Sequence, residues 1–308
     1  MNPLISIKIP TYNCAIYLKE TLSSILNQKY IDLDLLDIEV VDDFSTMDNP
    51  ESVVKELGND KIKFFRQKTN VGAIANFNTC IQRAKCEWVH ILHGDDIINN
   101  DFYFKYLACI NKNSSVSFIA SRVNFIDVNS NVIWEQSSFT LPVDKPFRTD
   151  LLINGNVFAT PSVMVKKSAY EELGFFKPFL NHTADWEMWS RIVFSKDAIL
   201  INEILCSWRD FQDSDTKKVR KNGNEIKDHA TAIVEISTYY KIPKISYKIP
   251  IDIGIRNCYY FIQHRDFKSF FNNYNELVKL TTVLKTISLT SNFISYFFKS
   301  SIKRYLSL

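Results

Sequence analysis

Two pairs of adjacent carboxylates are the residues of this sequence best suited to chemistry. Asp42-Asp43 ends one apolar run, and Asp95-Asp96 ends another, directly after His93-Gly94. Adjacent carboxylates repel each other unless a cation or hydrogen-bond donors compensate them. A hard divalent cation with oxygen ligands, Mg²⁺ or Mn²⁺, would do so and would also bridge phosphate oxygens. The alternative for the second pair is a structural one, in which one of its carboxylates caps the helix expected just downstream.

The apolar spacing around these pairs predicts how they are positioned. Four short apolar runs indicate strands, and segments with helical spacing separate them. The expected strands are Leu4 to Pro10, Asp37 to Asp42, Lys61 to Arg66 and Glu87 to Leu92. This order predicts a parallel sheet with helices on both faces, in which ligands bind at the carboxyl ends of the strands. Both acidic pairs then lie at one edge of the sheet.

The composition excludes several classes of protein. The 308 residues are 46% hydrophobic and 23% charged, which is ordinary for a globular protein and excludes a disordered chain. The seven glycines are too far apart for a GxGxxG or Walker A loop, so the common glycine cradles for dinucleotides and ATP are excluded. The six cysteines form no CxxC and there is no HExxH, so a structural zinc site is not expected.

Charge is divided unevenly along the chain. Residues 1–215 carry 21 Lys/Arg and 28 Asp/Glu, whereas residues 216–308 carry 16 and 6. From about residue 222 the apolar spacing is helical. We therefore expect an acidic α/β domain over residues 1–215 and a basic helical region over residues 216–308. The acidic part suits a reaction centre that holds cations, and the basic part suits contact with an anionic surface.

Seven short motifs follow one another over about residues 4–215. They are Ile9-Pro10-Thr11-Tyr12-Asn13, Val40-Val41-Asp42-Asp43-Phe44-Ser45, Asn70-Val71-Gly72, Leu92-His93-Gly94-Asp95-Asp96, Thr160-Pro161-Ser162, Glu172-Leu173-Gly174-Phe175-Phe176 and Ala184-Asp185-Trp186-Glu187-Met188-Trp189. Each is weak alone, but their order and spacing together are specific. Through them the chain resembles the inverting nucleotide-sugar glycosyltransferases of the large family 2. That resemblance implies a GT-A-like (Rossmann-like) α/β fold with a mixed, mainly parallel sheet flanked by helices, and here a helical C-terminal extension.

The resemblance implies a donor site along the carboxyl edge of the sheet. Thr11 and Tyr12 lie where the family holds the base and ribose, and Asp43 matches a carboxylate that accepts a hydrogen bond from the base. Such a carboxylate reads the imide N–H of uracil or thymine, which cytosine lacks, so a UDP-sugar is the expected donor. The further residues expected at the nucleotide sugar are Pro10, Asn70, Gly72, His93, Asp95 and Arg209.

The resemblance also implies a divalent cation, Mn²⁺ or Mg²⁺. Asp96 is the expected metal ligand, while Asp95 contacts ribose or metal-bound water. The cation neutralises charge that develops on the diphosphate leaving group. Many members of the family have a Tyr/Trp-Arg-x-His-x-x-Ser motif whose histidine assists the metal or diphosphate. Here Phe211 occupies that place, so diphosphate and water are expected to complete the metal shell.

Asp185 matches the general base of the family. It would deprotonate the acceptor hydroxyl as that oxygen attacks the anomeric carbon from the face opposite the diphosphate. Glu187 is the nearest rival, and without the upstream motifs a carboxylate that satisfies a helix dipole would be the simpler interpretation. Arg209 can pair with phosphate oxygens or, equally, with the acidic cluster.

The end of the sequence is basic and amphipathic. Residues 277–308 contain no acidic residue, and apolar residues recur there at spacings of three and four. This pattern is typical of a helix that lies in a membrane interface and attracts anionic lipids. The same apolar stripe could instead pack on the body or on a second subunit, so a homo-oligomer is compatible with the sequence. No recognition motif accompanies the lysines, and nucleic acid is not an expected partner.

These observations predict an enzyme that transfers one sugar by metal-assisted single displacement, with inversion. The expected acceptor is a glycan linked to lipid diphosphate or a growing bacterial surface glycan, as in lipopolysaccharide or capsule synthesis. The expected location is the cytoplasm, at the inner face of the cell membrane. Two rivals stay open: a metal-dependent sugar nucleotidyltransferase, and a non-catalytic carbohydrate-binding protein on the same fold.

Overall fold

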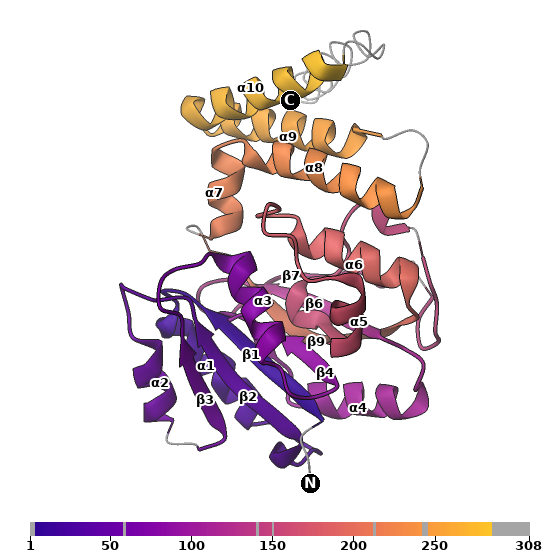
Figure 1. Ribbon diagram of the computed structural model, residues 1–308. Coiled ribbons are helices and arrows are strands. Elements are labelled where there is room, and N and C mark those ends of the chain that lie inside the picture. The colour runs from indigo at the N-terminus through magenta and orange to yellow at the C-terminus, as the bar shows by residue number, and fades with distance from the viewer. Residues whose placement is uncertain are drawn as a thin grey trace. The chain divides into compact units, whose positions relative to one another are not determined.

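The computed structural model describes residues 4–57, 60–139, 142–149, 151–211, 214–241 and 246–284. The chain divides into two compact units, Met1–Phe211 and Gln212–Leu308, which are drawn in Figure 1. The division lies near residue 215, where the composition changes from acidic to basic.

Within the described residues, the first unit contains one mixed sheet of nine strands. They are β1 (Ile5–Thr11), β2 (Leu36–Asp42), β3 (Ile62–Arg66), β4 (Trp88–Ile91), β5 (Ile97–Ile98), β6 (Phe118–Ile126), β7 (Val132–Glu135), β8 (Val163–Lys166) and β9 (Ala198–Arg209). Their order is β3-β2-β1-β4-β8-β6-β9-β5, with β7 beside β6. The strands β3, β2, β1 and β4 are parallel to one another, as are β6 and β9. The expected mixed, mainly parallel α/β sheet is thereby confirmed.

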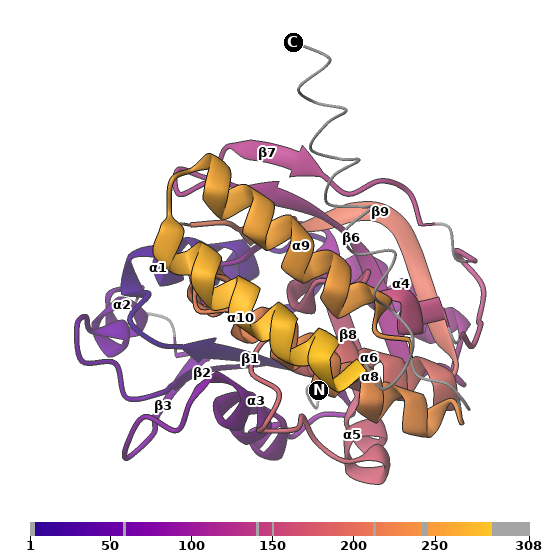
Figure 2. The ribbon, with the colours of Figure 1, turned by 90° about the horizontal axis from the view of Figure 1, so that it is seen from above.

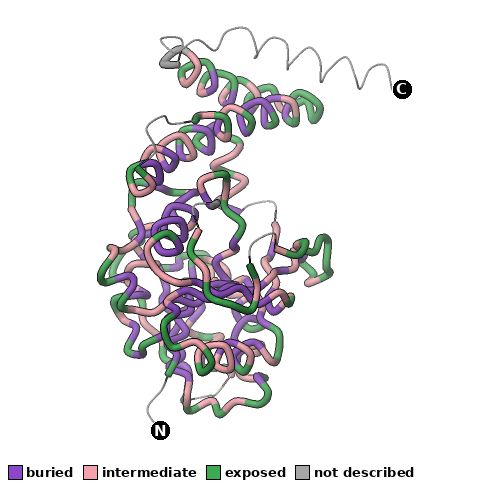
Figure 3. The backbone as a smooth tube through the Cα atoms, turned by 90° about the vertical axis from the view of Figure 1, so that its right-hand side faces the viewer, coloured by how far each residue is buried: buried purple, intermediate pink, exposed green. Residues whose placement is uncertain are grey.

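Helices cover both faces of this sheet. They are α1 (Ala15–Leu26), α2 (Pro50–Glu56), α3 (Ala73–Arg83), α4 (Phe102–Lys112), α5 (Lys167–Leu173) and α6 (Ala184–Ser195). Ile5, Ile7 and Ile9 of β1 form one core cluster with buried residues of α1, α2 and α4. On the other face, Arg83 of α3 reaches Glu39 of β2. Because both faces are covered, every residue of β1 and β2 is buried, and Figure 3 shows the strands as a buried band.

The face of β1 and β2 beneath α3 carries a buried charge network. Lys8 is 1% exposed, and its ammonium group donates to Asp37 and to Glu39 at 2.9 Å each. Lys63 pairs with Asp37, and Arg83 pairs with Glu39, both at 2.5 Å. A buried charge is tolerated when opposite charges and hydrogen bonds compensate it. The two carboxylates therefore stay ionised inside the sheet because three cations surround them.

The strand β8 is shorter than the apolar segment that contains it. The apolar residues over 157–166 predict a single strand, but only Val163–Lys166 pairs in the sheet, and a 3₁₀ turn over Thr160–Ser162 precedes it. Pro161 lies in this turn. Proline has no backbone N–H to donate to a strand ladder, which explains why the strand begins after it.

The second unit is helical, as the spacing from residue 222 predicts. Its helices are α7 (Asp215–Lys221), α8 (Asn224–Tyr239), α9 (Lys248–Gln263) and α10 (Phe267–Leu284). Figure 2 shows α9 and α10 lying side by side. A Cβ atom on Gly254 of α9 would lie 3.0 Å from side-chain atoms of Ile226 and Leu277, so glycine permits this close packing. None of the described helices combines the length and apolar character needed to cross a bilayer.

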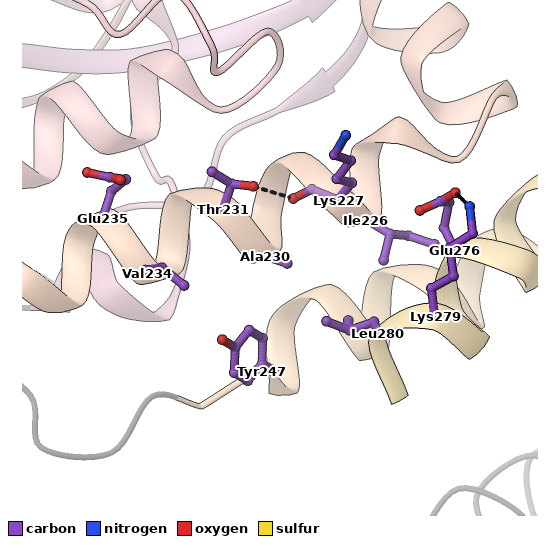
Figure 4. A pocket seen from close by; sticks show the side chains of 10 residues that line it. All are labelled: Ile226, Lys227, Ala230, Thr231, Val234, Glu235, Tyr247, Glu276, Lys279 and Leu280. Carbon is purple, nitrogen blue, oxygen red and sulfur yellow. Dashed lines mark hydrogen bonds and ion pairs between the residues drawn. The ribbon is translucent and has the colours of Figure 1, made fainter. Parts of the chain in front are cut away.

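A groove of about 420 Å³ lies in the second unit. Figure 4 shows Ala230 and Val234 of α8, Leu280 of α10 and Tyr247 among its lining residues. Its lining contains none of the residues that the sequence predicts for the site. Most of the amphipathic segment expected over residues 277–308 lies outside the described residues, which end at Leu284.

The buried network predicts acid sensitivity through Asp37. Burial would raise the pKa of Asp37, but hydrogen bonds from Lys63 and Lys8 outweigh it and lower the pKa from 3.8 to about 2. A carboxylate whose pKa is lower in the folded state than in the unfolded state stabilises the fold at pH values above its unfolded pKa. For Asp37 this contribution is lost as the pH falls from about 4 to about 2. We expect Asp37→Asn to lower the free energy of unfolding by about 2 kcal/mol at pH 7 and by less at pH 3, measured by urea denaturation.

Glu51→Gln is the matched control, because Glu51 forms an exposed pair with Lys55. It should change the free energy of unfolding by less than about 0.5 kcal/mol at either pH. A loss in Asp37→Asn of the same size at pH 7 and pH 3 would contradict the assignment.

Candidate functional site

The loops after β1, β2 and β4 meet at the carboxyl edge of the sheet. The N–H of Asp43 donates to the carbonyl of Thr11 at 2.8 Å, and the N–H of Gly94 donates to the carbonyl of Pro10 at 3.2 Å. These bonds join three loops that are far apart in the sequence. Pro10, Thr11, Asp43 and the segment 93–96 therefore lie together, as the parallel order of the strands predicts.

Gly94 is needed where the 93–96 loop crosses the end of β1. A Cβ atom there would lie 2.9 Å from Thr11 Oγ1 and 3.0 Å from Cys14 Sγ. Both distances are shorter than side chains tolerate, so only glycine lets the loop approach this closely. Thr11 is 2% exposed, whereas Tyr12 is 47% exposed and so is available to a ligand at this edge.

Asp43, Asn70 and Gly72 form one small structure. The carboxylate of Asp43 accepts from the N–H of Val71 at 2.8 Å and from the N–H of Gly72 at 2.9 Å. The side-chain amide of Asn70 donates to the carbonyl of Asp43 at 3.1 Å. Gly72 has a φ of 88° at the start of α3, a conformation that favours glycine. Each oxygen of the carboxylate keeps a lone pair for a further donor, such as a base N–H.

The electrostatic surroundings of Asp43 follow from its burial. Burial raises its pKa, and the neighbouring Asp42 adds to this, while the N–H groups of Val71 and Gly72 oppose it. Asp42 itself is 0% exposed, accepts from Ser45 and pairs with Arg66 at 2.9 Å. The oxygens of Asp42 therefore bind a side-chain cation and Ser45, whereas those of Asp43 accept only backbone N–H groups among the contacts described.

Sequence reasoning missed Asn13 and Ser45 as residues that shape this edge. The side-chain oxygen of Asn13 accepts from the N–H groups of Thr46 and Met47 at 3.0 Å each. The hydroxyl of Ser45 accepts from the N–H of Asn13 at 2.9 Å. Asn13 has a φ of 50°, which asparagine tolerates better than most residues. The sequence feature that could have pointed to Asn13 and Ser45 is that each ends one of the quoted motifs.

The second acidic pair forms a cluster with His93. One donor atom from each of His93, Asp95 and Asp96 lies within 4.8 Å of the others. Asp96 is 1% exposed, and its Oδ1 accepts from the N–H of Arg209 at 2.9 Å. Its Oδ2 lies 3.2 Å from His93 Nδ1 without the alignment of a hydrogen bond. Burial and the neighbouring Asp96 raise the pKa of Asp95, against the opposing field of His93.

These groups fit a divalent cation. A buried carboxylate oxygen that accepts no hydrogen bond is costly unless something else binds it. Within the described residues, Asp96 Oδ2 lacks a hydrogen-bond partner, and His93 Nδ1 lies 3.2 Å from it. Carboxylate oxygen and imidazole nitrogen are both ligands of first-row divalent metals. Asp96 is therefore the residue best placed to hold such a cation.

Arg209 occupies the centre of the loops rather than an exposed position. Its Nε donates to the carbonyl of Asp95 at 2.8 Å, and its guanidinium also donates to the Asp127 carbonyl and Ser130 Oγ at 3.0 Å each. A fourth bond, of 2.6 Å, goes to Glu20 of α1. The sequence allowed Arg209 to pair with phosphate oxygens or with the acidic cluster. These bonds favour the second alternative, the loop that carries Asp95 and Asp96. Contact of Arg209 with a nucleotide sugar stays a prediction.

Asp185 lies in the first turn of α6 beside polar neighbours. Its Oδ2 accepts from the side-chain amide of Asn156 at 3.0 Å, and its Oδ1 accepts from the N–H of Trp186 at 2.7 Å. Burial raises the pKa of Asp185, and the fields of His182 and His93 oppose this. His93 in turn responds to Asp185: burial would lower its pKa, but Asp96, Asp95 and Asp185 raise it. The charges of Asp185 and of the second acidic pair therefore both act on His93.

The alternatives to Asp185 on α6 are committed to the core. Glu187 is 0% exposed and pairs with Arg191 at 2.9 Å and with Lys177 at 3.4 Å. Trp186 and Trp189 are 2% and 1% exposed, so both aromatic side chains belong to the core. Of the two carboxylates, only Asp185 is partly exposed and can meet a substrate hydroxyl.

The bonds of Arg209 predict that it stabilises the loop arrangement. Lysine cannot reproduce four hydrogen bonds from a planar guanidinium, so Arg209→Lys should lower the free energy of unfolding by about 2–4 kcal/mol. Amide hydrogen exchange of residues 93–96 should also become faster. Urea denaturation and exchange by mass spectrometry measure both effects.

Arg148→Lys is the matched control, since Arg148 forms an exposed pair with Asp197 at 2.7 Å. It should cost less than about 0.5 kcal/mol. Equal losses in the two variants would show that Arg209 does not hold the loops.

Comparison with known proteins agrees with this fold. The family model described as Glycosyl transferase family 2 matches residues 6–174. A protein of Haemophilus influenzae described as an uncharacterized glycosyltransferase is 28% identical over 261 residues, which are 84% of this chain and 94% of the relative.

Two solved structures share the fold. TarS 1-349 of S. aureus in complex with UDP has a TM-score of 0.59 and 17% identity, and the match covers 81% of this chain and 69% of that one. The mannosyltransferase PcManGT of Pyrobaculum calidifontis, in complex with GDP-Man and Mn²⁺, has a TM-score of 0.56 and 14% identity, and the match covers 97% and 84%. Because the family model covers more than half of the sequence, the chain belongs to glycosyl transferase family 2, and it is a glycosyltransferase.

Proposed function

We propose that this glycosyltransferase moves one sugar from a UDP-sugar to an acceptor hydroxyl by metal-assisted single displacement, with inversion at the anomeric carbon. The observation that supports this proposal is that Asp185, a partly exposed carboxylate, and both carboxylates of the second acidic pair raise the pKa of His93. A base and a leaving-group site at one place are what a single displacement needs.

The donor end of the proposed site uses residues at the sheet edge. Asp43 is fixed by two backbone N–H groups and can still accept the imide N–H of uracil. The exposed ring of Tyr12 is available to stack on the base, and Asn70 and Gly72 hold the loop that carries these contacts. The UDP bound to TarS 1-349 supports this choice of nucleotide.

A divalent cation belongs to this proposal, with Asp96 as its ligand and Asp95 beside it. The Mn²⁺ in the structure of PcManGT supports a metal. When bound, such a cation supplies a Lewis acid that stabilises negative charge on the departing diphosphate. Bonds from Arg209 and the close approach at Gly94 hold the acidic loop against β1 and β9, which supports a preformed position for this ligand.

Asp185 acts at the acceptor. Its carboxylate takes the proton of the acceptor hydroxyl while that oxygen forms a bond to the anomeric carbon and the bond from that carbon to the diphosphate breaks. Burial raises the pKa of Asp185, which makes it a stronger base than an exposed aspartate. Asn156 donates to one carboxylate oxygen and so fixes the orientation of the group.

The acceptor is proposed to be a glycan on lipid diphosphate or a growing surface glycan, reached at an anionic membrane surface. Exposed apolar residues of α10 support this partner: Phe267, Phe271, Tyr274 and Val278, which are 59%, 57%, 43% and 40% exposed. Their spacing of four, three and four places them on one face of the helix. Residues 216–308 carry 16 Lys/Arg against 6 Asp/Glu, which complements an anionic bilayer.

The proposed base predicts a separation of binding from turnover. Asp185→Asn should lower hydrolysis of UDP-sugars, the transfer of sugar to water, by about 10²–10⁴-fold, because the amide cannot accept the proton. The affinity for UDP, measured by calorimetry with Mn²⁺, should stay within about threefold, because Asp43 is untouched. Asp101→Asn is the control, since Asp101 pairs only with Lys105 among the contacts described.

Near-normal hydrolysis in Asp185→Asn would refute its role as the base. Release of pyrophosphate instead of nucleoside diphosphate would identify the protein as a nucleotidyltransferase. Failure to bind any nucleotide sugar in a panel with UDP, GDP and CDP donors would favour a binding protein without this activity.

The apolar face of α10 predicts binding to anionic vesicles. Phosphatidylcholine vesicles containing phosphatidylglycerol should bind the protein, and pure phosphatidylcholine vesicles should bind it less. Phe267→Ser with Phe271→Ser should lower binding about tenfold, because two exposed aromatic side chains no longer enter the interface. Co-sedimentation measures the bound fraction.

Tyr30→Ser with Phe104→Ser is the matched control, as these rings are 75% and 46% exposed and lie in the first unit. Equal binding by both double variants would place the contact elsewhere. Binding to neither kind of vesicle would refute the membrane partner.

A further inference from the structure

His93, Asp95 and Asp96 bring several possible metal-ligand atoms together, and Asp96 is only one of these residues. His93 Nδ1 lies 3.2 Å from Asp96 Oδ2, and one atom each of His93, Asp95 and Asp96 lies within 4.8 Å of the others. Asp96 is 1% exposed, and within the described residues its Oδ2 accepts no hydrogen bond. A buried oxygen of this kind, close to a ring nitrogen, indicates one ligand that both atoms can bind.

We propose that His93 is a nitrogen ligand of the cation held by Asp96, and that the site therefore prefers Mn²⁺ and later first-row metals over Mg²⁺. This inference rests on the proposed metal-assisted function. It adds a specific donor atom to the site, and it assigns the metal class by the chemistry of that donor.

The distance between the two donor atoms fits a shared cation. Metal–ligand distances of about 2.1 Å at right angles place neighbouring donor atoms about 3 Å apart. The observed 3.2 Å between His93 Nδ1 and Asp96 Oδ2 is close to this value. Both atoms can therefore bind one cation with little movement of either side chain.

The ring of His93 is held in this orientation by its surroundings. It stacks on Phe77 with the ring centroids 5.1 Å apart and an angle of 18° between the planes. Phe77 in turn packs edge-on against Phe176 at 5.8 Å. The carbonyl of His93 accepts from the N–H of Asp96 at 3.2 Å, which closes the loop between them. The ring is therefore preorganised toward Asp96, which lowers the entropy lost on metal binding.

The guanidinium of Arg209 compensates the charge of this acidic pair only in part. Arg209 is 2% exposed and lies beside the pair, but its guanidinium donates to the backbone carbonyls of Asp95 and Asp127, to Ser130 and to Glu20. Only its backbone N–H reaches the Asp96 carboxylate. Two carboxylates so close together need a positive charge that lies nearer to them. A bound divalent cation supplies it.

The nitrogen donor decides which cations bind well. Mg²⁺ prefers oxygen ligands and near-ideal octahedral geometry, whereas imidazole suits later first-row metals. Phe211 has no donor atom, and its ring packs on Tyr17 at 5.8 Å. The histidine available to this cation is therefore His93, which lies in the same loop as Asp95 and Asp96.

Pulsed electron paramagnetic resonance of Mn²⁺ with UDP tests this ligand directly, because a coordinated ¹⁴N modulates the echo. Wild-type protein should show this nitrogen signal, and protein labelled with ¹⁵N-histidine should change it. His93→Gln should remove the signal and weaken Mn²⁺ binding by at least about tenfold, while Mg²⁺ binding changes by less than about threefold. His264→Gln is the matched control and should retain the signal, because His264 is exposed and lies outside this group. Thermal melting checks that each variant is folded.

The outcomes separate this inference from the proposed function. Mn²⁺ bound with UDP but without a nitrogen signal, or with a signal that survives in His93→Gln, would overturn the ligand and leave metal-assisted transfer intact. An affinity for UDP that changes neither with Mn²⁺ nor with Asp96→Asn would refute the proposed metal site. Isotope labelling of wild-type protein keeps the test valid if His93→Gln fails to fold.

Discussion

The crowding of carboxylates at one edge of a buried sheet is the constraint on which this structure depends. Like charges with little water around them are costly, so each must find compensation. Asp42 finds it in Arg66 and Ser45, and Asp43 finds it in backbone N–H groups. Asp96 has one backbone donor and one oxygen without a hydrogen bond. The degree of compensation separates the residues that hold the fold from those that can bind a ligand.

The segments around this edge are joined by polar groups that connect distant parts of the chain. Arg209 bonds to α1, to the 93–96 loop and to the turn between β6 and β7. Its positive charge is used in joining these segments, and it adds no freely exposed cation to the site. A long, always-charged side chain with a planar group suits this task, because it satisfies several carbonyl groups at once.

The helix α6 illustrates how close neighbours take different tasks. Asp185 and Glu187 are two residues apart, and each residue turns the helix by about 100°, so their side chains point to opposite sides. Glu187 pairs with Arg191 and faces the core, which fixes the helix. Asp185 points to Asn156 and lies within the field of His93. A fixed helix with a reactive first turn gives a base a defined position.

The sequence by itself determined the α/β order, the strand ends that carry Asp43 and Asp96, and the family, because apolar periods and ordered motifs are local properties. It also gave Asp185 as the candidate general base, with Glu187 as the alternative. Only the tertiary structure decided that Asp42 turns inward, that Arg209 bonds to the acidic loop, that Glu187 is buried, and that His93 faces Asp96. These outcomes depend on which groups meet across the sheet edge, and residue types and spacing do not contain that information.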